Sequence, residues 1–590
     1  MKRSEIDAKY YWNLNDLYES PAAWEKAYGE AEKTSFAAFR GKLGDKKQLL
    51  ACLKKQDEVS RKIERLYVYA HMLFDQDTSA AENGGYIARA QSLLVRLNAD
   101  TAFILPELTS LDEAFLQNCI ADGDFSDYDY MLQTVLKDKP HVLGEEAEKV
   151  LALGGDVYSA FRDVFTMTDN ADFPFPTVRD GDGKKVRVTH GMYSVCMQSG
   201  DRAFRRRAFK AYYGAYISLI NTITATYSGS VKKDVFLSKA RGYKSCLERA
   251  LAGEDVDIAV YENLLDAVHR ALPILHRYIE AKKNALKLDK MHMYDMYVPV
   301  VENADLKLEY EEACALVKEG LAPLGGEYVS LLQKAFDERW IDVFENDGKR
   351  SGAYSTSCYE VHPYVLLNYQ KTTHDVFTIA HEMGHSIHSY FSNRTQPYAK
   401  ADYKIFVAEV ASTVNEVLLL RHILGKAKDE KLKKYLLSYL LEMIRTTLFR
   451  QTQFAEFEYA AHEMAQKGVP LTKESLCKKY LRLNRAYYGK AVESDKEISY
   501  EWARIPHFYT SFYVYKYATG LVSALFIADR ILKEGKPAVE DYFKFLSSGG
   551  SADPVSLLKI AGVDLTKKDA FDGAMRVFGD TLSAFLSVGA

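Results

Sequence analysis

The spacing of apolar residues predicts helices through most of the first 170 positions of the chain. Between Lys47 and Asp77 the apolar residues recur mostly at steps of three and four, which places them on one face of an α-helix. Residues 80–98 and 145–168 repeat this pattern. We therefore predict a helical N-terminal region in which long helices pair as antiparallel hairpins.

The pattern changes after residue 170. Phe173–Val178 and Lys185–Val188 have the composition of short extended segments, and Asp180–Gly183 between them contains the Asp-Gly pairs of a tight turn. These features predict a β-hairpin near residues 173–190.

Helical periodicity returns at Asp201, so we predict two regions, a helical one over residues 1–200 that includes the hairpin and a second over residues 201–590. Within the second region, residues 293–300 and 352–370 are rich in aromatic and β-branched residues, which favours strands. The rest of the region again has the pattern of helices. The expected fold class is therefore mainly α, with a small β-sheet.

Composition and charge exclude several classes of protein. The 590 residues are 47% hydrophobic and 27% charged, with only 14 prolines, as in a globular chain rich in helix. The net charge of −4 arises from interspersed charges of both signs, without the basic stripe that a nucleic-acid partner requires. The sequence has no run of 18 apolar residues, so we expect no membrane span.

Cysteine usage indicates a reducing compartment. The seven cysteines are widely spaced and odd in number, and they form no CxxC pair, so neither a disulfide framework nor a thiolate metal site is indicated. Lys2 and Arg3 lie near the start of the sequence, but no apolar run follows as it would in a signal peptide. We expect buried free thiols and a cytoplasmic location.

The segment from Thr373 to His388 contains the motif HExxH. On a helix, His381 and His385 lie on one face and can present ring nitrogens to a single metal ion. Glu382 follows about 100° around the helix, close to the ion without being forced to bind it. Its carboxylate can take a proton from a water on the metal and pass it to a leaving amine.

A catalytic zinc usually has three protein ligands and one open position. The metzincin pattern is excluded, because His388 and Phe391 stand where that pattern has glycine and a third histidine. Glu409 is an acid within an apolar run, 24 residues after His385, and a buried carboxylate is costly unless a cation pairs with it. A second helix that folds back antiparallel would bring it to the histidines. His388 is the alternative third ligand, but that set would lack a carboxylate.

Two further residues need a separate interpretation. Glu416 lies two helical turns beyond Glu409, where it either accepts a hydrogen bond from a ligand imidazole or is a solvent-exposed charge. His462 begins a second HEM sequence, but Gln466 occupies the place of the second histidine, so we assign His462 to ordinary structure.

The motif segment HEMGHSIH followed by FVAEVASTVNE resembles the oligoendopeptidase F family, relatives of thimet oligopeptidase. WNLNDLY, KRSGAYS and HFYTSFYVYKYATG also resemble that family, so the likeness covers nearly the whole chain. The resemblance implies a large helical, two-lobed fold that encloses a deep channel. It further implies one zinc ion per chain at the channel floor, beside the small sheet, and cleavage of oligopeptides rather than folded proteins.

The resemblance also assigns roles to residues. It implies that His381, His385 and Glu409 hold the zinc and that Glu382 is the catalytic acid and base. In the family, a histidine and tyrosines of a C-terminal helix stabilise the oxyanion. For these we expect His507 and Tyr513 as catalytic residues, while Tyr509 and Tyr515 are expected to contact substrate; Tyr517 shares a helical face with Tyr509 and Tyr513.

The segment before the motif helix is expected to bind substrate. Gly352, Ala353 and Tyr354 can belong to an edge strand that pairs with an extended peptide backbone, and the resemblance supports this strand. His362 follows and can line the same groove.

These observations predict a zinc-dependent endopeptidase of the cytoplasm that acts on short peptides, as a monomer without nucleic-acid or membrane partners. A metallocarboxypeptidase on the same scaffold is the alternative enzyme. A catalytically inactive peptide-binding protein is the alternative from a different class.

Overall fold

The computed structural model describes residues 2–301 and 306–588. Helices dominate the chain, which confirms the predicted mainly-α class. Contacts divide the chain into two compact units, unit 1 (residues 1–142, 305–425 and 523–563) and unit 2 (residues 143–304, 426–522 and 564–590). This interleaved division differs from the consecutive regions 1–200 and 201–590 expected from the sequence, because residues 305–425 pack with the N-terminal helices.

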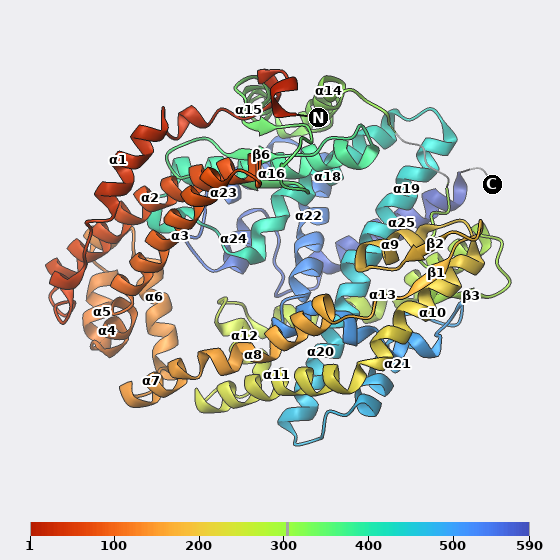
Figure 1. Cartoon of the computed structure of the whole chain (residues 1–590), viewed down its shortest axis with the longest axis horizontal. Helices are drawn as coiled ribbons and strands as arrows, with labels where there is room; N and C mark the ends of the chain where they lie inside the picture. Colours follow the sequence, from red (N-terminus) through yellow and green to blue (C-terminus); the bar gives the residue numbers. More distant parts are fainter. Residues whose placement is uncertain (1, 302–305, 589–590) are drawn as a thin grey trace. The chain divides into compact units, whose positions relative to one another are not determined.

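Unit 1 is built mainly of helices. They are α1 (Pro21–Ala31), α2 (Lys46–Gln76), α3 (Ala81–Thr101), α4 (Ile104–Ser110), α5 (Glu113–Ile120), α6 (Asp129–Asp138), α14 (Tyr310–Gly320), α15 (Gly326–Asp337), α16 (Thr373–Thr395), α17 (Tyr398–Ala401), α18 (Ile405–Lys426), α23 (Lys536–Leu546) and α24 (Pro554–Ile560). The helices α2 and α3 lie side by side (Figure 1), and both were predicted from their periodicity. The Asp45 side chain caps α2 by accepting a hydrogen bond from the N–H of Gln48 at 3.0 Å.

A three-stranded sheet lies in unit 1, with strands β4 (Ile341–Asp342), β5 (Tyr354–Thr356) and β6 (Tyr364–Leu366). The strand order is β4-β6-β5; β6 runs parallel to β4 and antiparallel to β5. The central strand β6 is buried throughout, whereas β5 has no neighbouring strand on its other side among residues 2–301 and 306–588. The small sheet predicted within residues 352–370 is therefore confirmed, with β5 at its edge.

Unit 2 is also mainly helical. Its helices are α7 (Glu145–Leu153), α8 (Gly155–Thr166), α9 (His190–Gln198), α10 (Arg202–Ser218), α11 (Ile220–Ala240), α12 (Cys246–Ala252), α13 (Ile258–Ala285), α19 (Glu430–Ile444), α20 (Arg450–Gln466), α21 (Lys473–Tyr488) and α25 (Asp569–Ser587). The division between the units falls within α22 (Tyr515–Glu534). In unit 2, α8 lies along α11 (Figure 1). The helix predicted over residues 145–168 is two helices, α7 and α8, which meet at Gly154.

The predicted β-hairpin is confirmed. Its strands β1 (Thr177–Arg179) and β2 (Lys185–Arg187) pair antiparallel. A further pair, β3 (Met291–His292) and β7 (Val492–Glu493), is parallel. In the described part of the chain, no helix combines the length and the apolar character needed to cross a membrane.

The strand predicted at residues 293–300 is wrong. Met293–Asp295 form a turn of 3-10 helix instead. The Asp295 side chain accepts a hydrogen bond from the N–H of His292 at 3.0 Å, and Asp495 accepts one from the N–H of Met293 at 3.2 Å. Because carboxylates take these backbone donors, the segment does not extend the pairing of β3.

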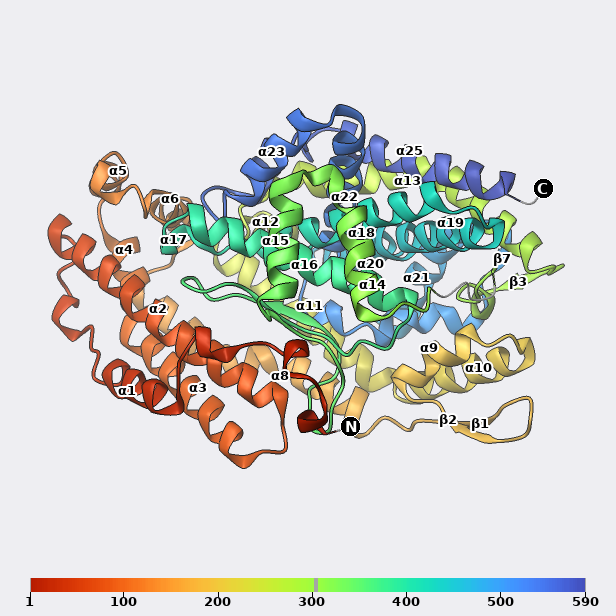
Figure 2. The ribbon, with the colours of Figure 1, turned by 90° about the horizontal axis from the view of Figure 1, so that it is seen from above.

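Helix α16 packs against several other elements of unit 1. The helices α14, α15 and α23 and the strands β5 and β6 pack against it, and Figure 2 shows α14 and α15 beside α16 and α18. The helix begins with a capping box, in which Thr372 accepts a hydrogen bond from the N–H of Asp375 and Asp375 accepts one from the N–H of Thr372. This cap fixes where the HExxH helix starts.

Gly384 lets α18 approach α16 closely. A Cβ atom at residue 384 would lie 2.5 Å from the Cα atom of Ser412 and 2.7 Å from the carbonyl oxygen of Ala411. Real side chains do not tolerate such contacts, so only glycine permits this crossing. The fully buried Asn415 fixes the register, because its amide donates to the carbonyl of Ala380 at 2.9 Å and accepts from the hydroxyl of Tyr328 at 2.8 Å.

Replacement of Gly384 by alanine is expected to destabilise the protein by roughly 1–3 kcal/mol, because the added methyl group must displace the backbone of α18. The measurement is the midpoint of thermal unfolding, which should fall by several degrees. Gly425→Ala is the matched control, since Gly425 belongs to α18 and its Cβ would meet no atom within 4 Å. Equal midpoints for the two variants would contradict the close crossing.

Candidate metal centre

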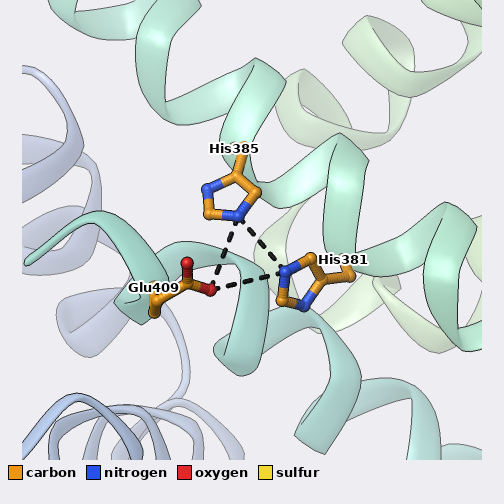
Figure 3. Close-up of side chains that lie close together, drawn as sticks. All are labelled: His381, His385 and Glu409. Atoms are coloured by element: carbon orange, nitrogen blue, oxygen red, sulfur yellow. Dashed lines mark hydrogen bonds and ion pairs between the residues drawn. The ribbon is translucent and has the colours of Figure 1, made fainter. Parts of the chain in front are cut away.

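Three side chains of unit 1 converge at the crossing of α16 and α18 (Figure 3). The Nε2 atoms of His381 and His385 lie 3.2 Å apart, and the Oε2 atom of Glu409 lies 3.4 Å from the first and 3.6 Å from the second. The two histidines are one turn apart on α16, and Glu409 comes from α18, which runs antiparallel because His381 contacts Glu416 and His385 contacts Glu409. The sequence predicted this set and this way of assembling it.

The spacing of the three atoms suits a tetrahedral metal ion. Metal–ligand bonds of about 2.0–2.2 Å at tetrahedral angles separate neighbouring ligand atoms by about 3.3–3.6 Å. Among the described residues, the metal-ligating cluster consists of His381, His385 and Glu409. A tetrahedral ion held by these three donors would have one further coordination position.

The electrostatics of the three residues favour a cation. Burial lowers the pKa of His381, but hydrogen bonds with Glu409 and Glu416 outweigh it and raise the pKa to about 10. Hydrogen bonds with His381 and His385 lower the pKa of Glu409. The site therefore stabilises positive charge between these side chains, as a divalent ion would supply it.

Glu416 orients the imidazole of His381. Its Oε1 atom lies 2.5 Å from Nδ1 of His381, so the ring donates its Nδ1–H to the carboxylate and keeps Nε2 free to bind an ion. The sequence left two interpretations of Glu416 open, and this contact confirms the first.

Glu409 differs from expectation in one respect. The sequence argument treated it as a buried carboxylate, but its side chain is 49% exposed. The adjoining Ser412 donates a hydrogen bond to the backbone carbonyl of Glu409 at 3.0 Å. Glu409 lines a cleft of unit 1, so its carboxylate is accessible to a substrate.

Glu382 follows the first histidine of the motif and is buried. Burial raises the pKa of its carboxyl group, while His381 and His385 act in the opposite direction. A carboxylate with a raised pKa holds a proton more readily, which suits a group that accepts and then donates one.

The histidines that the sequence analysis set aside lie elsewhere. His388 is buried and stacks on Tyr403, with 3.8 Å between ring centroids, and burial lowers its pKa to about 3. In unit 2, His462 is buried between the carbonyl of Glu458 and the carboxylate of Asp234. The assignment of His462 to ordinary structure is confirmed.

A cleft of about 1210 Å³ in unit 1 contains the candidate metal centre. The strand β5 forms one of its walls, and Ala353 and Tyr354 are among the lining residues. Ser355 of β5 and Ser386 of α16 share a hydrogen bond of 2.9 Å, which ties the strand to the motif helix. The predicted edge strand thus borders the same cleft as His381 and His385.

The predicted substrate residues of this segment differ in their contacts. Gly352, with a φ of +89°, and Ala353 are exposed. The Tyr354 hydroxyl donates to Oδ2 of the buried Asp75 at 2.7 Å. The side chain of Tyr354 therefore anchors β5 to α2, and its backbone remains the part suited to pairing with a peptide. His362 stacks on Trp340 and is not among the residues that line the cleft.

The C-terminal tyrosine segment of unit 2 is not the continuous helix that the sequence predicted. Residues 506–509 form a turn of 3-10 helix, Phe512 has a φ of +57°, and α22 begins only at Tyr515. The N–H of Phe512 donates to the buried carboxylate of Glu458 at 2.8 Å. This hydrogen bond draws the backbone out of helical geometry.

This irregular backbone brings His507, Tyr513 and Tyr517 together. The rings of His507 and Tyr513 stack with centroids 5.9 Å apart, and the hydroxyl of Tyr517 lies 3.3 Å from Nε2 of His507. Tyr509 and Tyr515, the predicted substrate contacts, are buried instead. Tyr509 shares a hydrogen bond of 2.8 Å with Thr226, and Tyr515 packs on Tyr261.

Sequence reasoning missed several residues that shape the site. Gly384 within HEMGH could have indicated a close helix crossing. The sequence alone does not show that α18 packs against this glycine. Asn415 and Ser386 gave no signal, because a buried amide or hydroxyl is recognised only from its partners.

Comparisons with known proteins agree with one another. A family model described as "Peptidase family M3" matches residues 195–577, and one described as "Oligopeptidase F" matches residues 107–175. Oligopeptidase PepF of Bacillus subtilis is 43% identical over 98% of this chain and 87% of its own length. Group B oligopeptidase PepB of Streptococcus agalactiae is 39% identical over 98% of this chain and 97% of its own length.

Solved structures are similar along the whole chain. A crystal structure from Chlamydophila abortus has a TM-score of 0.95 and 36% identity, and covers 100% of this chain and 99% of its own. The structure of oligoendopeptidase-F from Enterococcus faecium has a TM-score of 0.73 and 34% identity. It covers 97% of this chain and 99% of its own.

Glu416→Gln is expected to lower the affinity for metal about 10-fold or more, because His381 loses its charged acceptor. The measurement is competition with a chromophoric chelator for zinc. Glu327→Gln, at an exposed position of α15, serves as the control and should bind zinc as the unaltered protein does. Equal affinities for both variants would show that Glu416 does not support the site.

Proposed function

Because this chain belongs to peptidase family M3, we propose that it is a zinc-dependent endopeptidase that hydrolyses internal bonds of short peptides. The observation that carries the proposal is the convergence of His381, His385 and Glu409 in a cleft bordered by an edge strand. Relatives that carry the names oligopeptidase and oligoendopeptidase F support the choice of short peptides as substrates.

The donor set supports zinc as the ion. Two imidazoles and one carboxylate with an open fourth position form a common catalytic zinc site. Bound there, zinc supplies a Lewis acid that polarises a carbonyl group and acidifies water.

The residues of the chain perform the proton transfers and hold the substrate. The backbone of β5 binds an extended peptide by adding it as a further strand. Glu382 accepts a proton from the attacking water at its carboxylate and delivers it to the nitrogen that leaves. Glu416 keeps His381 in the orientation that binds the ion.

We also propose that His507 and Tyr513 donate hydrogen bonds to the oxyanion, a role that rests on the resemblance of their segment to the oligoendopeptidase F family. Their mutual contact in unit 2 supports a shared role, and the hydroxyl of Tyr517 is positioned to orient the His507 ring. Because Tyr509 and Tyr515 are buried, we propose that they support the conformation of this segment by packing in the core.

An endopeptidase should cleave a short peptide whose N-terminus is acetylated and whose C-terminus is amidated, with both products carrying an intact blocked end. Mass spectrometry of the products tests this, and a chelator should stop the reaction. Glu382→Gln should retain zinc yet lower kcat by about 100-fold or more, since no carboxylate remains to transfer the proton. Cleavage only of peptides with a free C-terminus would identify a carboxypeptidase; zinc binding without turnover of any peptide would identify a binding protein.

Tyr513→Phe should lower kcat by roughly 100-fold or more with little change in KM, because an oxyanion donor acts mainly in the transition state. The comparison is Tyr509→Phe, whose hydroxyl contacts Thr226 and which should mainly lower the unfolding midpoint. Steady-state kinetics on one peptide measures both variants. A larger loss of kcat in the Tyr509 variant would reverse the two assignments.

A further inference from the structure

The cleft of unit 1 extends well beyond the metal centre. His381, His385, Ser389 and Asn393 all line it and follow one another at steps of four along α16. At about 1.5 Å per residue, this face of the helix is about 18 Å long. An extended peptide of five or six residues covers that length.

Glu64 of α2 lines the same cleft, toward the end of α16 that is remote from the motif. Its carboxylate lies beside the backbone N–H of Tyr359 and the hydroxyl of Tyr398. The hydroxyl of Tyr359 in turn donates to the carbonyl of Gln396 at 2.7 Å, and Gln396 is the residue at which α16 ends. Glu64 and the metal donors therefore mark two separate parts of one cleft.

The carboxyl group of Glu64 has no cationic partner among the described residues. Its Oε2 atom is buried and accepts no hydrogen bond there. Arg61 and Arg65, its neighbours on α2, pair with Glu360 instead. Burial raises the pKa of Glu64 to about 7, and the negative charge of Asp402 acts in the same direction.

The rest of the lining does not supply the missing charge. Lys404 is the single lysine or arginine among the described residues that line the cleft, and its ammonium group lies 5.6 Å from the ring centroid of Tyr130. Buried carboxylates with a structural role in this unit are paired, as Asp75 is by the hydroxyl of Tyr354 and the guanidinium of Arg350. Glu64 has the Tyr398 hydroxyl beside it, but among the described residues it has no guanidinium or ammonium partner, and a partly buried carboxylate without a cation is costly.

We propose that Glu64 is a specificity-determining residue that binds a positively charged group of the peptide substrate, several residues away from the bond that is cut. The group is an ammonium or guanidinium, from a lysine or arginine side chain or from the peptide's own N-terminus. The inference rests on the proposed peptidase function, because the cleft must hold a peptide that extends along α16 from the metal centre.

Two series of peptides distinguish the sources of the charge. In the first, both ends are blocked, and arginine is compared with its neutral isostere citrulline at each of six positions on either side of the cleavage site. In the second, a citrulline peptide carries either a free or an acetylated N-terminus. The quantity measured is the ratio of kcat/KM for the charged peptide to that for the neutral one.

The unaltered enzyme should prefer the charged peptide about 10-fold at one position or for the free N-terminus, as a partly buried charged hydrogen bond provides. Glu64→Gln should bring this ratio close to one. The matched control is Glu58→Gln on the same helix, because Glu58 is exposed and pairs with Lys62, and this variant should keep the preference. Zinc content and the unfolding midpoint establish that both variants are folded.

The outcomes separate this inference from the proposed function. If the unaltered enzyme cuts the citrulline peptides and shows no charge preference at any position or at the N-terminus, the role of Glu64 is overturned while the peptidase stands. A preference that Glu64→Gln leaves intact overturns it too. If no peptide of either series is cut, the proposed function itself fails.

Discussion

The close crossing of α16 and α18 is the constraint on which the site depends. The two histidines and the glutamate belong to different helices, and their donor atoms meet within 3.6 Å only because the helix backbones nearly touch at Gly384. Asn415 sets the register of that contact with hydrogen bonds on both sides. The geometry of the metal centre is therefore a property of helix packing, and the donor side chains themselves contribute little to fixing it.

A second consequence of this packing is the concentration of negative charge. Glu382, Glu409 and Glu416 all lie around His381 and His385, and unit 1 brings no arginine or lysine into hydrogen-bonding contact with these carboxylates in its described part. Such an arrangement is costly for the isolated chain and becomes favourable once a divalent cation is bound. Metal binding and folding of this region are thus linked.

The sequence predicted the elements that depend on local pattern and the residues that belong to a motif. The helix α2, the hairpin of β1 and β2, the edge strand β5 and the set of His381, His385 and Glu409 all followed from periodicity, turn residues and spacing. What failed depends on distant partners. The carboxylates of Asp295 and Glu458 capture backbone N–H groups, so the strand expected at residues 293–300 and the helix expected through Phe512 do not form. Neither hydrogen bond can be predicted without knowing which segments are in contact in the fold.

The interleaved order of the two units has a consequence for synthesis on the ribosome. Helix α16 packs against α23, which lies about 140 residues further along the chain (Lys536–Leu546, against Thr373–Thr395). While residues 426–522 are being synthesised, the face of α16 that later packs on α23 is uncovered. At that stage unit 1 lacks residues 523–563 and unit 2 lacks residues 564–590. Pairing across such separations is slow to form and leaves apolar surface open to misassociation. In a nascent chain of this design, the face of α16 that packs on α23 therefore stays uncovered until residues 536–546 have been synthesised.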